Sequence, residues 1–170
     1  MTGVRWVDER EQRAWRALQF MQLLLAGRLA TDVAATSDLS YANYLVLFAL
    51  GDQPDVRARL FELAEALGWE KSRLSHQVAG MTGRGLVKKE RCDGDRRGAF
   101  VVVTAPGRKA IEAAAPHHVA MARRLFIDPL TPGELAAITS AAEKVLAVLD
   151  TEAADGHDDG GGRREERPSR

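Results

Sequence analysis

Apolar residues recur in the middle of the chain at helical spacing. Four of them occupy positions i, i+3, i+4 and i+7: Leu60, Leu63, Ala64 and Leu67. This spacing predicts a helix with one buried face, and Gly68 ends it, because glycine takes a positive φ without steric cost. A second apolar stripe follows, formed by Leu74, Val78 and Met81, and ends at Gly85. The pattern therefore predicts two short helices joined by a tight glycine turn.

After the second helix the pattern changes to that of a β-hairpin. Leu86 and Val87 begin one strand, and the run from Phe100 to Val103 is β-branched and aromatic, as in a second strand. Between them lie turn-forming Asp and Gly residues and a pair of arginines. A helix pair followed by a basic ribbon is typical of a winged helix-turn-helix. Its second helix suits the major groove of DNA, and its ribbon suits the flanking backbone or the minor groove.

Longer helices are predicted on both sides of this segment. Residues 8–36 carry a wide apolar stripe, formed by Trp15, Leu18, Phe20, Met21, Leu23, Leu24, Leu25, Leu29 and Val33. A helix that is apolar on more than one side must be covered on more than one side, which favours a second subunit. Residues 106–150 are predicted to form further helices, with a kink or break at Pro116 and an end at Asp128-Pro129.

Local capping signals place the ends of several helices. Ser40 is suited to cap a helix that runs from Tyr41 to Leu50 and ends at Gly51. Thr104 is suited to cap the helix that follows the hairpin. The segment Thr131-Pro132-Gly133-Glu134 has the Thr-x-x-Glu pattern of a capping box, which predicts another helix start.

These elements predict a mainly α protein of the α+β kind. We expect a single domain over residues 1–150, with a winged helix-turn-helix over about residues 40–104. The dimerisation region is expected to be built from N- and C-terminal helices over about residues 8–36 and 106–150. Residues 151–170 are polar and glycine-rich, which predicts a disordered tail.

Basic residues are concentrated in the segment predicted to contact DNA. The whole chain is neutral, with 24 Lys and Arg against 24 Asp and Glu. Residues 57–109 contain 12 basic and 6 acidic residues, a net charge of +6, so the remainder of the chain carries −6. A positive excess confined to the segment shaped for a groove indicates nucleic-acid contact.

The candidates for DNA contact on the second helix lie off its apolar stripe. They are Lys71, Ser72, Arg73, Ser75, His76 and Gln77. Their side chains are short or rich in donors, as contacts to bases and phosphates require. Arg73 is suited to bind a guanine edge and Gln77 an adenine edge, each through two hydrogen bonds. For each residue the alternative is a phosphate contact or exposure to solvent.

Several of these residues, at their spacing, resemble the MarR family of bacterial regulators. The resemblance covers about residues 8–150 and rests on Arg84-Gly85-Leu86-Val87, on Asp95-Arg96-Arg97, and on Thr104 and Gly107. It implies an obligate homodimer that binds a pseudo-palindromic operator on double-stranded DNA and represses transcription. It also implies release by a small-molecule effector or by oxidation.

The resemblance assigns roles at the wing. Asp95 would orient Arg97, whose guanidinium would enter the minor groove, and Arg96 would meet phosphate. The alternative is a surface ion pair, which contributes little to stability. The implied effector is a small phenolic or aromatic carboxylate, held in an apolar pocket between the dimer helices and the DNA-reading lobe. The sequence does not indicate which residues bind it.

Other chemistry has few candidate residues. We find no cluster of metal ligands and no nucleophile with a base, so we expect no enzyme, metal or cofactor. His117 and His118 are adjacent and point about 100° apart on a helix, which disfavours chelation of one metal ion, although one of them is a candidate to line the effector pocket. Cys92 is the single cysteine, so an alternative is a regulator that responds to oxidation of this thiol. A further alternative is an architectural or protein-interaction winged-helix protein.

The sequence also bears on location. No stretch reaches the roughly 18 apolar residues that a membrane helix needs. The segment from Met1 to Arg16 is highly charged and has no apolar signal core. We therefore expect a cytoplasmic protein without membrane contact.

Overall fold

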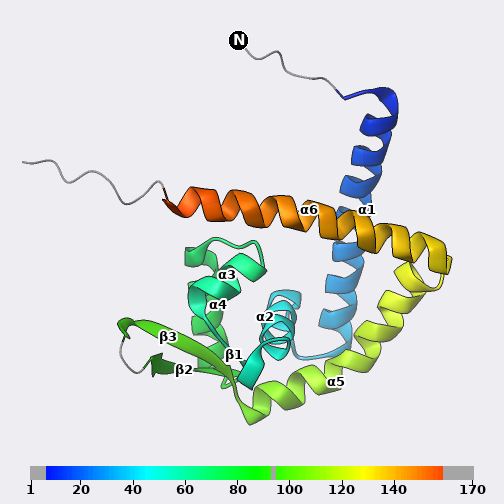
Figure 1. The fold of residues 1–170 in the computed structure, drawn as a ribbon. Helices are drawn as coiled ribbons and strands as arrows, with labels where there is room; N and C mark the ends of the chain where they lie inside the picture. Colours follow the sequence, from blue (N-terminus) through cyan, green and yellow to red (C-terminus); the bar gives the residue numbers. More distant parts are fainter. Residues whose placement is uncertain (1–6, 93–94, 159–170) are drawn as a thin grey trace, which may run out of the picture. The chain divides into compact units, whose positions relative to one another are not determined.

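The computed structural model describes residues 7–92 and 95–158. Its α-helices are α1 (Glu9–Thr36), α2 (Tyr41–Gly51), α3 (Leu60–Ala66), α4 (Lys71–Gly83), α5 (Ala105–Ala122) and α6 (Pro132–Asp158). Its strands are β1 (Arg57–Arg59), β2 (Val87–Cys92) and β3 (Asp95–Val103). A short 3-10 turn, η1 (Pro54–Val56), precedes β1, and a π-helical turn, η2 (Arg123–Ile127), follows α5. The predicted fold class is confirmed: helices predominate, and the α3–α4 pair leads into the β2–β3 hairpin (Figure 1).

Contacts within the chain divide it into two compact units. The first, residues 1–125, contains the winged helix-turn-helix together with α1 and α5. The second, residues 126–170, contains α6. The single domain over residues 1–150 therefore stays a prediction. Helix α6 continues past the predicted boundary at residue 150, to Asp158. Glu and Ala residues in this stretch favour helix even though it lacks an apolar stripe. Residues 159–170 lie outside the described part of the chain.

The three strands form one antiparallel sheet in the order β1-β3-β2. Strand β3 lies in the middle, where Val102 pairs with Arg57 of β1 and with Lys88 of β2. Strand β1 was not predicted. Its sequence, Arg-Ala-Arg, is too short to show a strand pattern, and its structure depends on pairing with β3 more than 40 residues later along the chain.

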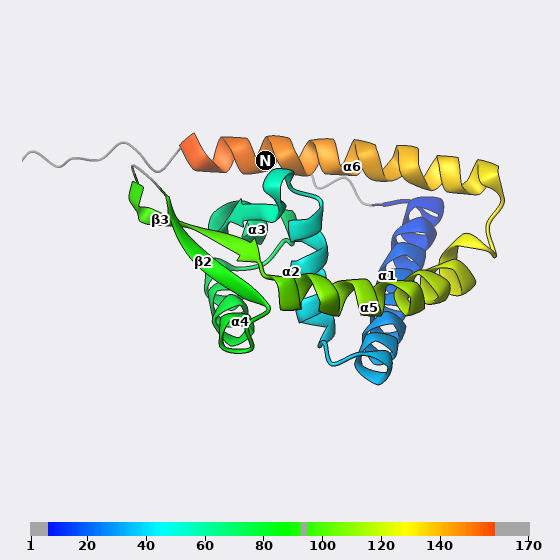
Figure 2. The ribbon, with the colours of Figure 1, turned by 90° about the horizontal axis from the view of Figure 1, so that it is seen from below.

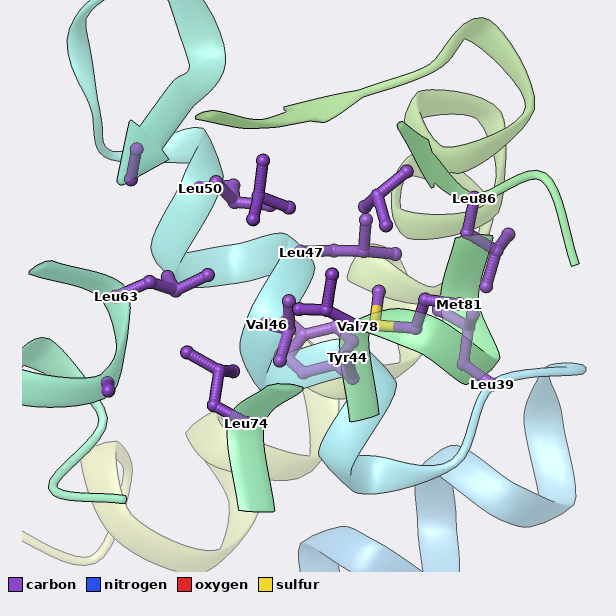
Figure 3. Packing of buried hydrophobic residues seen from close by; sticks show 14 of the residues in the cluster. Leu39, Tyr44, Val46, Leu47, Leu50, Leu63, Leu74, Val78, Met81 and Leu86 are labelled. Atoms are coloured by element: carbon purple, nitrogen blue, oxygen red, sulfur yellow. The ribbon is translucent and has the colours of Figure 1, made fainter. Parts of the chain in front are cut away.

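The hydrophobic core joins α2, α3, α4 and the sheet. Its largest fully buried side chains are Leu47, Leu50, Leu63, Leu74, Met81, Val33, Val46, Val78, Val87 and Val101. Figure 3 shows Leu47, Val78 and Met81 pointing into the same interior. The stripe predicted for α4 is therefore confirmed. Burial of each such side chain contributes about 1.5–3 kcal/mol, so this stripe sets which side of α4 faces outward.

The predicted turns and caps are confirmed. Gly68 and Gly85, which follow α3 and α4, have φ values of 61° and 70°. Ser40 Oγ accepts a hydrogen bond from the Asn43 amide at 3.1 Å and caps α2. At the start of α6, the amide of Glu134 donates to Thr131 Oγ1 at 3.3 Å. These turns and caps could be predicted from the sequence because each involves residues only a few positions apart.

The break predicted as one outcome at Pro116 does not occur. Helix α5 runs through this residue to Ala122 and bends along its length (Figure 1). Proline removes one backbone donor, and a bend accommodates its ring. Pro116 is exposed, so water can serve the carbonyl that it leaves without a partner, while buried Ala114 nearby keeps the helix packed.

Among the described residues, no single helix is long and apolar enough to cross a membrane. Helices α1 and α2 meet that criterion only when taken together, and they are bent by 96° at the break between them.

Candidate nucleic-acid interface

Helix α4 presents a polar surface opposite its buried stripe. Leu74 and Val78 are fully buried on its inner side. Four of the predicted contact residues are exposed: Lys71, Ser72, Arg73 and His76. The other two, Ser75 and Gln77, are half-buried, because they lie closer to the apolar stripe. The structure therefore brings all six onto one helix and separates them into an outer and a flanking group.

The outer surface of α4 also carries small residues that sequence reasoning did not single out. Ala79, Gly80 and Gly83 are exposed on the same side as Ser72 and His76. A Cβ atom added at Gly80 or Gly83 would meet none of the described residues within 4 Å. Within the described part of the chain, nothing covers this part of the helix.

Arg73 is held by an aromatic ring at the start of α4. Its guanidinium carbon lies 4.2 Å from the centre of the Trp69 ring. Such a cation–π contact stabilises by about 0.5–1 kcal/mol at an exposed site. The stack restricts the guanidinium while leaving its N–H donors available around the edge of its plane.

The side chain of Gln77 is not fully available for DNA contact, although the sequence had indicated that it would be. Its Nε2 donates a hydrogen bond to Oδ1 of Asn43 in the first turn of α2. Asn43 is buried, with 5% of its surface exposed. One of the two N–H donors of Gln77 is thus used within the protein, a contact that the spacing of apolar residues could not reveal.

The β2–β3 hairpin extends away from α3 and α4 (Figures 1 and 2). The backbones of Asp95, Arg96 and Arg97 belong to β3 at the distal end of this hairpin. Their side chains, and that of Cys92, lie outside the described part of the structure, as do residues 93 and 94. The roles assigned to them therefore stay predictions.

The sheet adds basic residues that sequence reasoning did not place. Arg57 and Arg59 of β1 both stack on Phe100, with guanidinium carbons 4.8 Å and 5.7 Å from the ring centre. In the same face, Lys88 Nζ lies 2.7 Å from Glu90 Oε1, and this contact lowers the pKa of Glu90. A period of two puts both arginines on one face of β1, but three residues are too few to show that period in the sequence.

A second polar cluster lies where α1, α2 and α5 meet. The His118 ring of α5 lies 4.4 Å from the Tyr44 ring of α2. Burial lowers the pKa of His118, partly opposed by the charge of Asp32 on α1. Asp32 Oδ2 and His118 Nδ1 are both buried and have no hydrogen-bond partner among the described residues. His117, in contrast, is exposed.

The described residues contain no group of three or more His, Cys, Asp or Glu side chains placed to hold a metal ion. The arrangement of α4, the hairpin and the basic sheet face is suited to contact a polyanion.

Known proteins share this arrangement. A model of the MarR family matches residues 37–98. The crystal structure of AbsC, a MarR family transcriptional regulator from Streptomyces coelicolor, is 38% identical to this chain with a TM-score of 0.79. The match covers 87% of this chain and 99% of AbsC. The chain belongs to the MarR family of transcriptional regulators.

Other MarR proteins are similar over different lengths. Sco3205 from Streptomyces coelicolor, solved in complex with DNA, is 31% identical with a TM-score of 0.80, covering 88% of this chain and 93% of Sco3205. Transcriptional regulator HosA from Escherichia coli is 38% identical over 79 residues. That match includes 46% of this chain and spans 57% of HosA, a little over half its length.

Proposed function

We propose that this MarR-family chain is a sequence-specific DNA-binding transcriptional regulator, and that it acts as a dimeric repressor. The observation that carries the proposal is the exposed polar surface of α4, which lies opposite a fully buried stripe and leads into a basic hairpin. Sco3205, a family member of the same fold, was solved in complex with DNA. An enzyme has no comparable support.

In the proposed complex, α4 enters the major groove and the hairpin reaches the adjacent backbone or minor groove. Arg73 and Gln77 contact base edges, while Lys71, Ser72, Ser75 and His76 contact bases or phosphates. Asp95 orients Arg97 at the minor groove, and Arg96 meets phosphate. The net charge of +6 over residues 57–109 supplies the attraction that does not depend on sequence.

A second copy of the chain is proposed to complete the structure. Helix α1 exposes large apolar side chains: Trp15, Leu18, Phe20, Met21, Leu23 and Leu24. Helix α6 exposes another set: Val145, Leu146, Val148 and Leu149. Monomeric proteins rarely leave large apolar side chains exposed side by side in such number. A symmetric dimer would place two α4 helices about one DNA turn apart, roughly 34 Å, which predicts a pseudo-palindromic operator.

Control by a small phenolic or aromatic carboxylate is the part of the proposal that rests on family resemblance. The cluster of Asp32, Tyr44 and His118 is our candidate for the region that such an effector contacts, because it joins α1 and α5 to the DNA-reading lobe. An effector releases DNA only if it binds the DNA-incompetent arrangement more tightly than the competent one. Oxidation of Cys92 is the competing trigger, and peroxide release that disappears in Cys92→Ser would favour it.

Recovery of bound genomic fragments, followed by protection footprinting, tests the proposal. We expect discrete sites with two-fold symmetry. Uniform coverage of the fragments would instead favour an architectural protein that binds DNA without reading its sequence. If no DNA is protected at low salt, the proposed function is wrong.

A further inference from the structure

The contact between Asn43 and Gln77 joins a buried residue of α2 to the helix proposed to read DNA. The two residues are 34 positions apart in the chain. A buried amide costs free energy unless it is hydrogen-bonded. The Oδ1 atom of Asn43 accepts its hydrogen bond from Gln77 Nε2. The partner of this buried group is thus a half-buried side chain on the flank of the exposed surface of α4.

The contact determines which end of the Gln77 carboxamide faces outward. A carboxamide has an acceptor oxygen at one end and an NH₂ donor group at the other. Rotation about the last side-chain bond of glutamine has a broad energy profile, so an exposed glutamine exchanges the two ends easily. In the structure Asn43 presents its Oδ1 atom to Gln77, so the Gln77 nitrogen turns toward α2 and Oε1 turns away from it.

We propose that Asn43 is a positioning residue that orients the Gln77 carboxamide and thereby sets a base preference of α4. Outward-facing Oε1 requires a donor, and the major groove offers one only from adenine N6 or cytosine N4. The NH₂ group keeps a second hydrogen on the side of Oε1, which adenine N7 can accept. Adenine is therefore the base we expect opposite Gln77. This inference rests on the proposed function.

If Asn43 only stabilised the fold, replacing it would change the free energy of unfolding and leave the base preference of α4 unchanged. Replacing both partners of a buried hydrogen bond by apolar groups of similar shape can be nearly neutral for stability. A base preference, in contrast, depends on the orientation of the Gln77 amide. The preference at one base pair is therefore the quantity to measure.

The experiment selects binding sites from a randomised duplex DNA library with the full chain and its variants. Asn43→Leu removes the acceptor at similar volume, whereas Asn43→Asp keeps an oxygen that can accept from Gln77. Gln77→Met removes the reading group itself. We expect the wild-type chain to prefer adenine at one position per half-site. Asn43→Leu and Gln77→Met should each reduce that preference about tenfold, and Asn43→Asp should retain it.

Two outcomes of the selection contradict different claims. If the wild-type chain enriches no sequence, both the proposed function and this inference fail. If the wild-type chain enriches a motif and folded Asn43→Leu enriches the same motif equally at every position, only the inference is overturned. The double variant of Asn43→Leu with Gln77→Met should lose no more preference than Gln77→Met alone, because the two residues act as one unit.

A measurement on the wild-type protein covers the case in which Asn43→Leu does not fold. The side-chain amide protons of Gln77 should exchange with solvent more slowly than those of Gln12, which is exposed on α1. Equal exchange of the two side chains would show that Asn43 does not hold Gln77, and the inference would be wrong.

Discussion

Gly107 lies at a close contact between the start of α5 and the base of the hairpin. An ideal Cβ atom at this position would lie 2.0 Å from the Leu86 carbonyl oxygen and 3.2 Å from Val103 Cγ1. The carbonyl oxygen cannot easily move away. It accepts a hydrogen bond from the backbone N–H of Thr104 at 3.2 Å. It also lies 3.0 Å from the Thr104 hydroxyl, which shares its one proton with the Gly85 carbonyl oxygen at 2.6 Å. Gly107→Ala should therefore displace the backbone where β2 and α5 meet.

The expected magnitude follows from three effects. Overpacking of a closed site costs about 1–3 kcal/mol. Displacement of the Leu86 carbonyl weakens its backbone hydrogen bond and the shared hydroxyl contact, which together contribute roughly 1–2 kcal/mol. Alanine returns up to about 1 kcal/mol through its higher helix propensity. We expect the free energy of unfolding to fall by about 2–4 kcal/mol.

Urea unfolding followed by circular dichroism measures this loss. The variants must be compared at equal protein concentration, since the stability of a dimer depends on it. Gly80→Ala is the matched control. It adds the same methyl group to α4, where the new Cβ meets no atom of residues 7–92 and 95–158 within 4 Å. That variant should be as stable as the wild type or up to about 1 kcal/mol more stable. An unchanged unfolding midpoint for Gly107→Ala would refute the argument.

Three further predictions concern DNA binding, pH and assembly. Arg73→Ala should weaken binding to a selected DNA site by roughly 1–3 kcal/mol. Arg73→Lys keeps the charge but loses the planar stack on Trp69, so it should restore only the salt-dependent part of the binding free energy. DNA titrations at several salt concentrations in which both variants bind like the wild type would contradict this prediction. Burial lowers the pKa of His118 below its ordinary 6.5, so the unfolded chain binds the proton more readily. The contribution of neutral His118 to the free energy of unfolding should therefore be fully present above about pH 6.5 and be lost as the pH falls below that value. Urea unfolding at several pH values should show a smaller loss of stability at low pH for His118→Gln than for the wild type. Sedimentation should show a species of twice the chain mass. Leu24→Asp should reduce the fraction of this dimer, because Leu24 is 65% exposed on α1. Phe61→Asp should leave the dimer fraction unchanged, although Phe61 on α3 is also exposed, at 47%.

Much of the winged helix-turn-helix could be predicted from short stretches of sequence. The stripe of Leu74, Val78 and Met81, the positive φ of Gly85 and the cap at Ser40 are confirmed. Each of these features depends on neighbours within a few residues, so its physical cause is present in the local sequence. The exposure of Lys71, Ser72, Arg73 and His76 on α4 followed from this stripe, whereas the half-burial of Ser75 and Gln77 did not.

Some boundaries could not be predicted in this way. Strand β1 forms because β3 offers it a partner, and its own three residues give no sign of that pairing. Helix α5 continues through Pro116, although the local rule allowed for a break there. For β1, pairing with a distant strand outweighs the local preference. In α5, a bend accommodates the ring of Pro116.

The sequence by itself determined the features that suit DNA contact: an amphipathic α4, a basic hairpin and a positive segment in a neutral chain. Only the tertiary structure decided how those residues are held. It places Arg73 on Trp69, Gln77 on Asn43 and His118 beside Tyr44. The reason is physical. Periodicity records whether a side chain faces the core or the solvent, but the partner of a polar group depends on which helices pack together, and that is decided by the whole core.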